Sequence, residues 1–213
     1  MKLTRVQEKA CRALVILSCV VLLGGALSVP FYYETQTLWY KVGADKVILR
    51  AGQLVGLVTL VLLVLQIMLS LRAGFYEELF GGANLIRWHR LNGVFIACAA
   101  CGHVLLILGP EGFKNLPIGK KYWPEMTGGG LFLLIQLTVV FSFFRHALRL
   151  DYKLWRTIHI PLGYVILVLA LIHVLFVSES FRQGAPRLLL LTVFIGLALL
   201  TAVVKQGRWK MKS

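Results

Sequence analysis

Six uninterrupted apolar runs constrain the fold of this chain more than any other feature. Each run is 17 to 22 residues long and contains no Asp, Glu, Lys or Arg. An α-helix needs about 20 apolar residues to cross the hydrocarbon core of a bilayer. The runs are residues 13–33, 51–71, 91–110, 126–144, 157–178 and 188–204. The sequence therefore predicts an all-α membrane protein, a six-transmembrane-helix bundle that forms one integral membrane domain over residues 1–213.

The basic residues predict how this bundle lies in the membrane. Of the 23 Lys and Arg residues, fifteen lie in segments 1–12, 72–90, 145–156 and 205–212, on the side of both termini. The positive-inside rule then predicts that the N- and C-termini are cytoplasmic. This topology accounts for the net charge of +14 without nucleic acid as a partner. We expect a multi-pass protein of a bacterial inner membrane, in contact with the lipid bilayer, whose long connections 73–87 and 111–125 are ordered loops.

Two pairs of histidines share one spacing. His89 and His103 belong to the third predicted helix, and His159 and His173 belong to the fifth. Fourteen residues are just short of four helical turns, so each pair lies on one helix face, at levels about 21 Å apart. Both helices run outward in the predicted topology. His89 and His159 are therefore expected at the inner level, and His103 and His173 at the outer level.

Matching histidines on two parallel helices favour two planar cofactors, one at each level. Imidazole is a common axial ligand of haem iron, whereas zinc prefers three or four ligands at one depth. Gly93 and Gly163 follow the inner histidines by one turn and leave room for a macrocycle edge. The alternative is that the histidines only form hydrogen bonds between helices. We favour two haem b groups, with the four histidines as iron ligands.

Three arginines are candidate partners of the anionic haem propionates. Arg50 opens the second predicted helix at the outer level, and Arg90 and Arg156 adjoin the inner histidines. Arginine can hold a carboxylate with two hydrogen bonds. The alternative for each is an ordinary charge that sets topology. His146 lies at the inner end of the fourth helix without a partner fourteen residues away, and is expected to be an interfacial histidine; the alternative is a role near the inner haem.

Two readings from other functional classes also remain open. Cys98 and Cys101 form a C-A-A-C motif, which a thiol–quinone oxidoreductase could use. Both thiols are expected to point away from the histidine face and to serve in packing, and CAACGH lacks the C-x-x-C-H of covalent haem attachment. The other reading is a haem-free transporter that uses the histidines as a proton relay.

Several of these segments resemble the ferric reductase-like transmembrane domain. They are LRAG at residues 49–52, WHRLNG at 88–93, GHVLLI at 102–107, WRTIHIPLGY at 155–164 and LIHVLF at 171–176. This superfamily includes ferric-chelate reductases, NADPH oxidases and the haem-binding membrane subunit of the methionine-sulfoxide reductase system. The resemblance covers about residues 45–178. It implies that the four histidines ligate two b-type haems and that Arg50 lies near the outer haem.

Two departures from the family pattern shape the expected function. Ile107 stands where NADPH oxidases carry a further histidine, and we expect no fused flavin and nicotinamide domain of the kind that the large reductases carry. We expect an oxidoreductase component without catalytic side chains of its own, a transmembrane b-type cytochrome. Its donor would be a separate flavoprotein reductase, flavin (FMN or FAD) or quinol at the cytoplasmic side. Its acceptor would be ferric iron or a dedicated extracytoplasmic reductase of the methionine-sulfoxide reductase type.

Overall fold

The computed structural model is built from α-helices. It describes residues 4–33, 38, 40–71, 74–113, 116–182 and 184–210. Within those residues it contains no strand and seven α-helices with defined bounds. They are α1 (Arg5–Tyr32), α3 (Gly43–Leu71), α4 (Gly74–Phe80), α5 (Gly82–Leu108), α6 (Trp123–Phe143), α7 (Tyr152–Val177) and α8 (Gly184–Lys210), with short 3₁₀ turns η1 (Gly109–Glu111), η2 (Lys120–Tyr122) and η3 (Glu179–Phe181). The all-α prediction is confirmed.

The six long helices carry a lipid-compatible outer surface. In the part of the chain that the structure describes, all helices except the short α4 are long and apolar enough to cross a membrane. Large apolar side chains project outward from them, among them Val21 at 64% exposure, Phe95 at 64% and Val203 at 66%. A soluble protein rarely exposes so much contiguous apolar surface, whereas lipid tails would cover it. The protein is an integral multi-pass membrane protein.

Polar residues before the apolar runs extend the helices beyond them. Thr4 and Gln7 form a reciprocal capping box at the start of α1. The carboxylate of Asp151 accepts hydrogen bonds from the backbone N–H groups of Lys153 and Leu154, at 2.8 and 3.1 Å, at the start of α7. These caps satisfy N–H groups that a helix start leaves without intrahelical partners. The charged flanks before the first and fifth runs are therefore helical.

The two connections expected to be loops are partly helical, so that prediction is wrong. Residues 74–80 form α4, and α5 already begins at Gly82. Gly81 separates the two helices with φ of 78°, a left-handed conformation that glycine adopts without steric cost. In the other connection, η2 leads directly into α6. Pro124 occupies the first turn of α6, where a backbone N–H would have no intrahelical acceptor, so its missing N–H costs no helix hydrogen bond.

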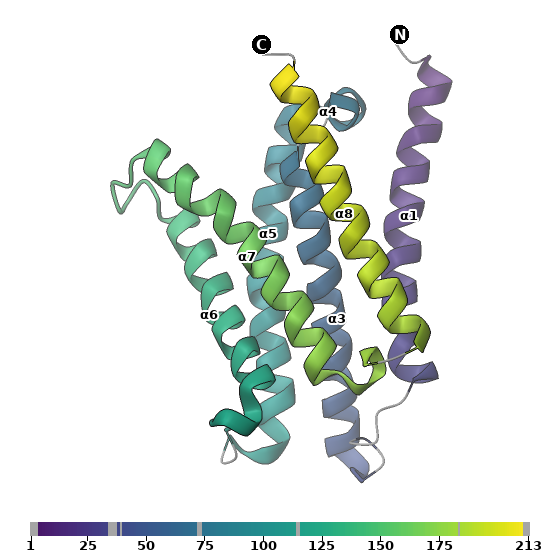
Figure 1. The fold of residues 1–213 in the computed structure, drawn as a ribbon, viewed down its shortest axis with the longest axis vertical. Coiled ribbons are helices and arrows are strands. Elements are labelled where there is room, and N and C mark those ends of the chain that lie inside the picture. Colours follow the sequence, from purple (N-terminus) through teal and green to yellow (C-terminus); the bar gives the residue numbers. More distant parts are fainter. Residues whose placement is uncertain are drawn as a thin grey trace.

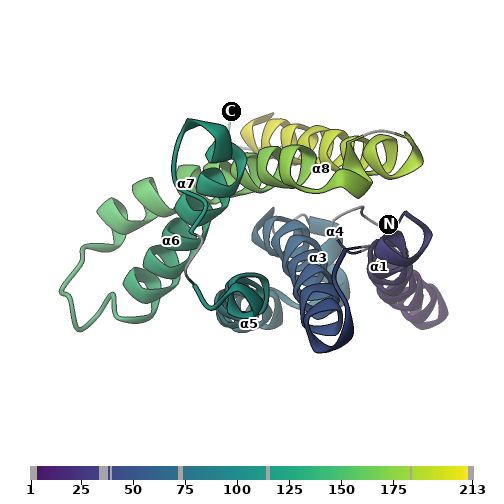
Figure 2. The same ribbon diagram turned by 90° about the horizontal axis from the view of Figure 1, so that it is seen from below.

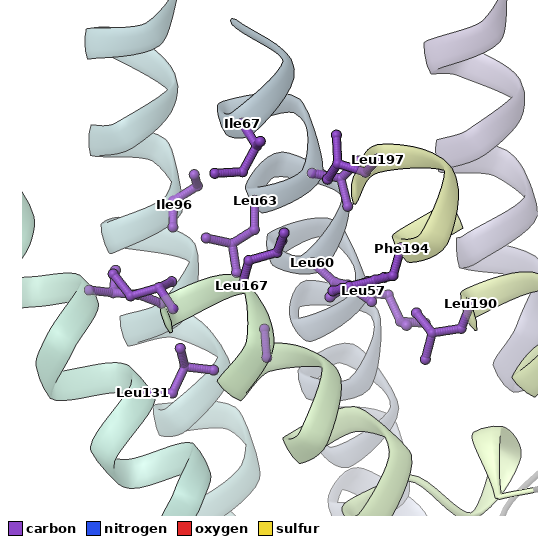
Figure 3. Close-up of a cluster of buried hydrophobic side chains, with 14 of the residues drawn as sticks. Leu57, Leu60, Leu63, Ile67, Ile96, Leu131, Leu167, Leu190, Phe194 and Leu197 are labelled. Carbon is purple, nitrogen blue, oxygen red and sulfur yellow. The ribbon is translucent and has the colours of Figure 1, made fainter. Parts of the chain in front are cut away.

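Helix α3 lies at the centre of the bundle. It contacts α1, α5, α7 and α8, and 44% of its most apolar stretch is buried, compared with 6–17% in the other five spans. Viewed along the bundle, α1, α3 and α5 form one row, with α7 and α8 across from them (Figure 2). The core joins side chains from five helices (Figure 3); they include Leu57, Leu60, Leu63, Ile67, Ile96, Leu131, Leu167, Leu190, Phe194 and Leu197.

The direction of the helices places the histidines at two ends of the bundle. Helix α1 begins and α8 ends at the same end, which we call the inner end; the opposite end is the outer end (Figure 1). Helices α5 and α7 both run from the inner end to the outer end. The predicted co-direction of the two histidine helices is therefore confirmed.

Candidate functional site

The bundle brings the four histidines together in two pairs. His89 and His103 lie on α5, and His159 and His173 lie on α7. The inner rings of His89 and His159 are direct neighbours. His103 and His173 follow them by fourteen residues on the same two co-directional helices. Among the described residues no group of three or more His, Cys, Asp or Glu side chains gathers. Each level thus offers two imidazoles.

At the inner level, the two imidazoles have the spacing of two ligands on one metal. The ring centroids of His89 and His159 are 6.2 Å apart, and the ring planes are inclined by 77°. Two imidazoles on opposite sides of a metal, with bonds of about 2.0 Å, place their ring centres about 6 Å apart. The donor chemistry and the separation of this pair both fit a bis-histidine haem.

Side chains on α6 and α7 fix the ring of His159. The Oγ of Ser142 lies 3.3 Å from Nδ1 of His159 and accepts a hydrogen bond from the indole Nε1 of Trp155, also at 3.3 Å. The indole stacks on the imidazole, with centroids 4.7 Å apart and planes inclined by 23°. Arg145 covers the Trp155 ring at 5.7 Å. The position and orientation of His159 are therefore set by its neighbours.

A polar network from α3 surrounds His89. The amide Nε2 of Gln66 donates to the backbone carbonyl of His89 at 3.0 Å and lies 3.3 Å from the ring nitrogen Nε2. The Gln66 Oε1 accepts from Asn92 Nδ2 at 2.7 Å, and Asn92 also donates to the carbonyl of Leu62 at 2.9 Å. A Cβ on Gly93 would lie 3.3 Å from Gln66 Nε2, so Gly93 makes room for this network.

One ring nitrogen of His89 has no protein partner. Nδ1 is buried and makes no hydrogen bond to the residues that the structure describes. A buried polar atom without a partner costs about 1–3 kcal/mol, and buried polar groups in native proteins are nearly always satisfied. A metal ligand needs one ring nitrogen for the metal, so this unpaired nitrogen fits a haem.

At the outer level, main-chain carbonyls orient both rings. Nδ1 of His103 lies 2.8 Å from the carbonyl oxygen of Gly52 on α3. Nδ1 of His173 lies 3.0 Å from the carbonyl oxygen of Pro124 on α6. A carbonyl only accepts, so each Nδ1 carries the proton and donates it. Nε2 is then the nitrogen left for iron, the arrangement usual for metal-ligating histidines.

A family model described as the ferric reductase-like transmembrane component matches residues 55–171. The chain belongs to this family. The match begins within α3, includes His89, His103 and His159, and stops two residues before His173. No curated protein and no solved structure matches the chain.

In this ferric reductase-like protein, the three predicted arginines lie in different surroundings. Arg50 donates to the carbonyl of Pro30 at 3.1 Å and covers the ring of Phe31 at 5.0 Å, and both partners belong to α1. Arg90 and Arg156 are exposed beside the inner histidines. Contact of these three residues with haem propionates stays a prediction. Arg50 also links α1 to α3.

The other candidates make no contact with the paired rings among the described contacts. His146 is exposed in the turn after α6, where its Nε2 lies 2.9 Å from Arg145 Nη2. The cysteines of the described chain are free thiols, and Cys98 is exposed while Cys101 is half-buried. The expected packing role of Cys98 is therefore wrong, because its side chain faces the outside of the bundle.

Sequence reasoning missed the residues that orient the histidines. Gln66 and Ser142 are polar residues inside or at the end of apolar runs, and that contrast was the available signal. Trp155 opens the WRTIHIPLGY segment, but the segment does not show that its indole stacks on His159. Gly56 and Gly128, whose contacts are described below, carry no local signal beyond being small.

Proposed function

We propose that this ferric reductase-like protein is a transmembrane cytochrome b that transfers electrons across the membrane. His89 and His159 would hold an inner haem, and His103 and His173 an outer one. The observation that carries the proposal is the 6.2 Å separation of the His89 and His159 rings, which suits two ligands on one iron. The carbonyl bonds to Nδ1 of both outer histidines support the second site.

The protein's own groups would hold and shield the cofactors. Haem iron, when bound, supplies one-electron redox chemistry. Two histidines at each level would complete its coordination, which favours electron transfer over binding of oxygen. Ser142 and Gln66 orient the inner rings, and the apolar core between the two levels excludes water. The chain provides position and a dry environment rather than catalytic side chains.

The charge distribution supports a direction for the transfer. The positive-inside rule predicts that the inner end lies in the cytoplasm. Arg90 and Arg156 adjoin the inner histidines in the sequence, and Arg145 covers the ring of Trp155. These cations would attract an anionic flavin or an acidic flavoprotein, and quinol could reach the same level from the membrane. The acceptor would be ferric iron or a dedicated periplasmic reductase. This assignment corresponds to a bacterial inner membrane.

A haem count on purified protein tests the proposal. We expect two non-covalent haems per chain, both six-coordinate and both removed by acid–acetone. Replacing either inner histidine by Ala should remove one haem, and replacing either outer histidine should remove the other. His146→Ala is the matched control and should retain two. A colourless protein, or loss of haem from His146→Ala but not from His89→Ala, would contradict the proposal.

A further inference from the structure

The two outer histidines approach neighbouring helices in the same way. His103 donates to the carbonyl of Gly52 on α3, and His173 donates to the carbonyl of Pro124 on α6. In both helices the residue four positions later is glycine, Gly56 in α3 and Gly128 in α6. The same pairing of an accepting carbonyl with a glycine at i+4 thus occurs on two separate helices.

Helix geometry explains why position i+4 matters for this contact. The carbonyl of residue i points along the helix toward the N–H of residue i+4, so the side chain of residue i+4 stands beside that oxygen. The carbonyl has a second lone pair that can accept from a histidine N–H. A donor from another helix reaches this lone pair only if the side chain at i+4 leaves the approach open.

The rings occupy the space that a side chain would fill. A Cβ on Gly56 would lie 2.8 Å from both Nδ1 and Cε1 of His103. A Cβ on Gly128 would lie 2.6 Å from Nδ1 and 3.0 Å from Nε2 of His173. Carbon atoms pack at about 3.5–4.0 Å, so either ring would have to move. Movement would lengthen or break the bond between Nδ1 and the carbonyl.

We propose that Gly56 and Gly128 are positioning residues for the outer haem ligands. By leaving the carbonyls of Gly52 and Pro124 accessible, they hold His103 and His173 with Nδ1 protonated and Nε2 directed to the iron. This inference rests on the proposed function, because it concerns the ligands of one of the two haems. It distinguishes the two levels: main-chain carbonyls orient the outer rings, whereas side chains of Ser142 and Gln66 flank the inner ones.

Two other glycines of α6 provide matched controls. Gly129 and Gly130 follow Gly128 in α6, and a Cβ on either would meet no atom within 4 Å. Gly129→Ala and Gly130→Ala therefore change the helix without a contact.

The test compares Gly56→Ala and Gly128→Ala with these controls in full-length protein in nanodiscs. Haem per chain and the low-spin ferric EPR signals are measured, together with the ¹⁵N shifts of labelled histidines in protein produced without haem. We expect each variant to fall from two haems to one, to keep the inner signal and to lose the Nδ1-protonated form of its histidine. Gly129→Ala and Gly130→Ala should keep two haems and both histidine forms.

Several outcomes would overturn the inference. Two haems with unchanged EPR signals and unchanged ¹⁵N shifts in both variants would show that the glycines are not needed. Loss of both haems in both variants, with intact controls, would also contradict it, because the effect should be confined to the outer site. If one variant does not fold, the other variant still tests the inference, because Gly56 and Gly128 lie in different helices. Wild-type protein without haem would instead refute the proposed function, while the ¹⁵N shifts would still test the glycines.

Discussion

The imidazole of His89 on α5 meets the imidazole of His159 on α7 almost at right angles, at 77°, with ring centroids 6.2 Å apart. Neither ring is free to turn, because Trp155 stacks on His159 and Gln66 contacts His89. The mutual angle of the inner pair is thus a property of the surrounding side chains, and it has a spectroscopic consequence.

The inner haem should give a low-spin ferric EPR signal with an unusually large highest g value. Axial imidazoles that are nearly perpendicular leave two iron d orbitals almost equal in energy, and this near-degeneracy raises that g value. EPR on the oxidised protein at low temperature checks it. The signal should disappear in His89→Ala and persist in His103→Ala. The reverse assignment would contradict the pairing of His89 with His159.

Gln66→Leu should weaken the inner site and leave the outer site unchanged. The substitution removes the donor to the His89 carbonyl and the acceptor for Asn92. Each lost hydrogen bond should cost about 1 kcal/mol of stability. Gln136→Leu is the control, since Gln136 donates to the carbonyl of Ala97 at 3.0 Å and contacts no histidine in the described contacts.

Thermal unfolding and the EPR spectrum separate the two effects of these glutamine substitutions. Both variants should unfold at lower temperature. Only Gln66→Leu should change the signal of the inner haem. Equal changes in both spectra would mean that Gln66 acts through general packing alone.

Ser142→Ala should raise the midpoint potential of the inner haem. The Oγ of Ser142 lies 3.3 Å from Nδ1 of His159. A hydrogen-bond acceptor at that nitrogen makes the imidazole a more basic ligand. A less basic imidazole stabilises ferric iron less, so reduction becomes easier. Thr138→Ala is the control, because Thr138 lies one turn earlier in α6 and bonds only within that helix, to the carbonyl of Leu134 at 2.6 Å. A redox titration that finds equal potentials in Ser142→Ala and wild type would refute this.

The double variant Cys98→Ser, Cys101→Ser should retain both haems and full electron transfer. Cys98 is exposed on the outside of the bundle, and both thiols are free. Stopped-flow reduction followed at the haem absorbance is the measurement. Slower transfer with an unchanged spectrum would support the thiol–quinone alternative.

The 213-residue chain should not be reduced by NADH alone. A nucleotide-binding fold needs a glycine-rich loop after a strand, and the described part of the chain contains no strand. Adding a flavin reductase should start reduction, and the rate should fall as salt screens the basic inner end. Rapid reduction in a nanodisc sample that contains only NADH would contradict the assignment of a separate donor.

The sequence by itself determined the number of membrane spans and the two levels of histidine. Hydropathy is a local property, so charge-free runs locate the spans without knowledge of their neighbours. The fourteen-residue spacing follows from helix geometry, which makes the shared face of His89 and His103 predictable. Helices α5 and α7 are the third and fifth membrane spans. Successive spans alternate in direction, so these two run in the same direction (Figure 1).

Only the tertiary structure decided which residues orient the histidines. The spans are apolar on nearly all sides, so their sequences do not specify which face of one helix meets which neighbour. The rotation of α3 brings Gln66 to His89 and Gly56 to His103, and it turns Arg50 toward Pro30 of α1. These contacts depend on close packing among the five helices of the core, α3 included, and no single segment encodes that packing.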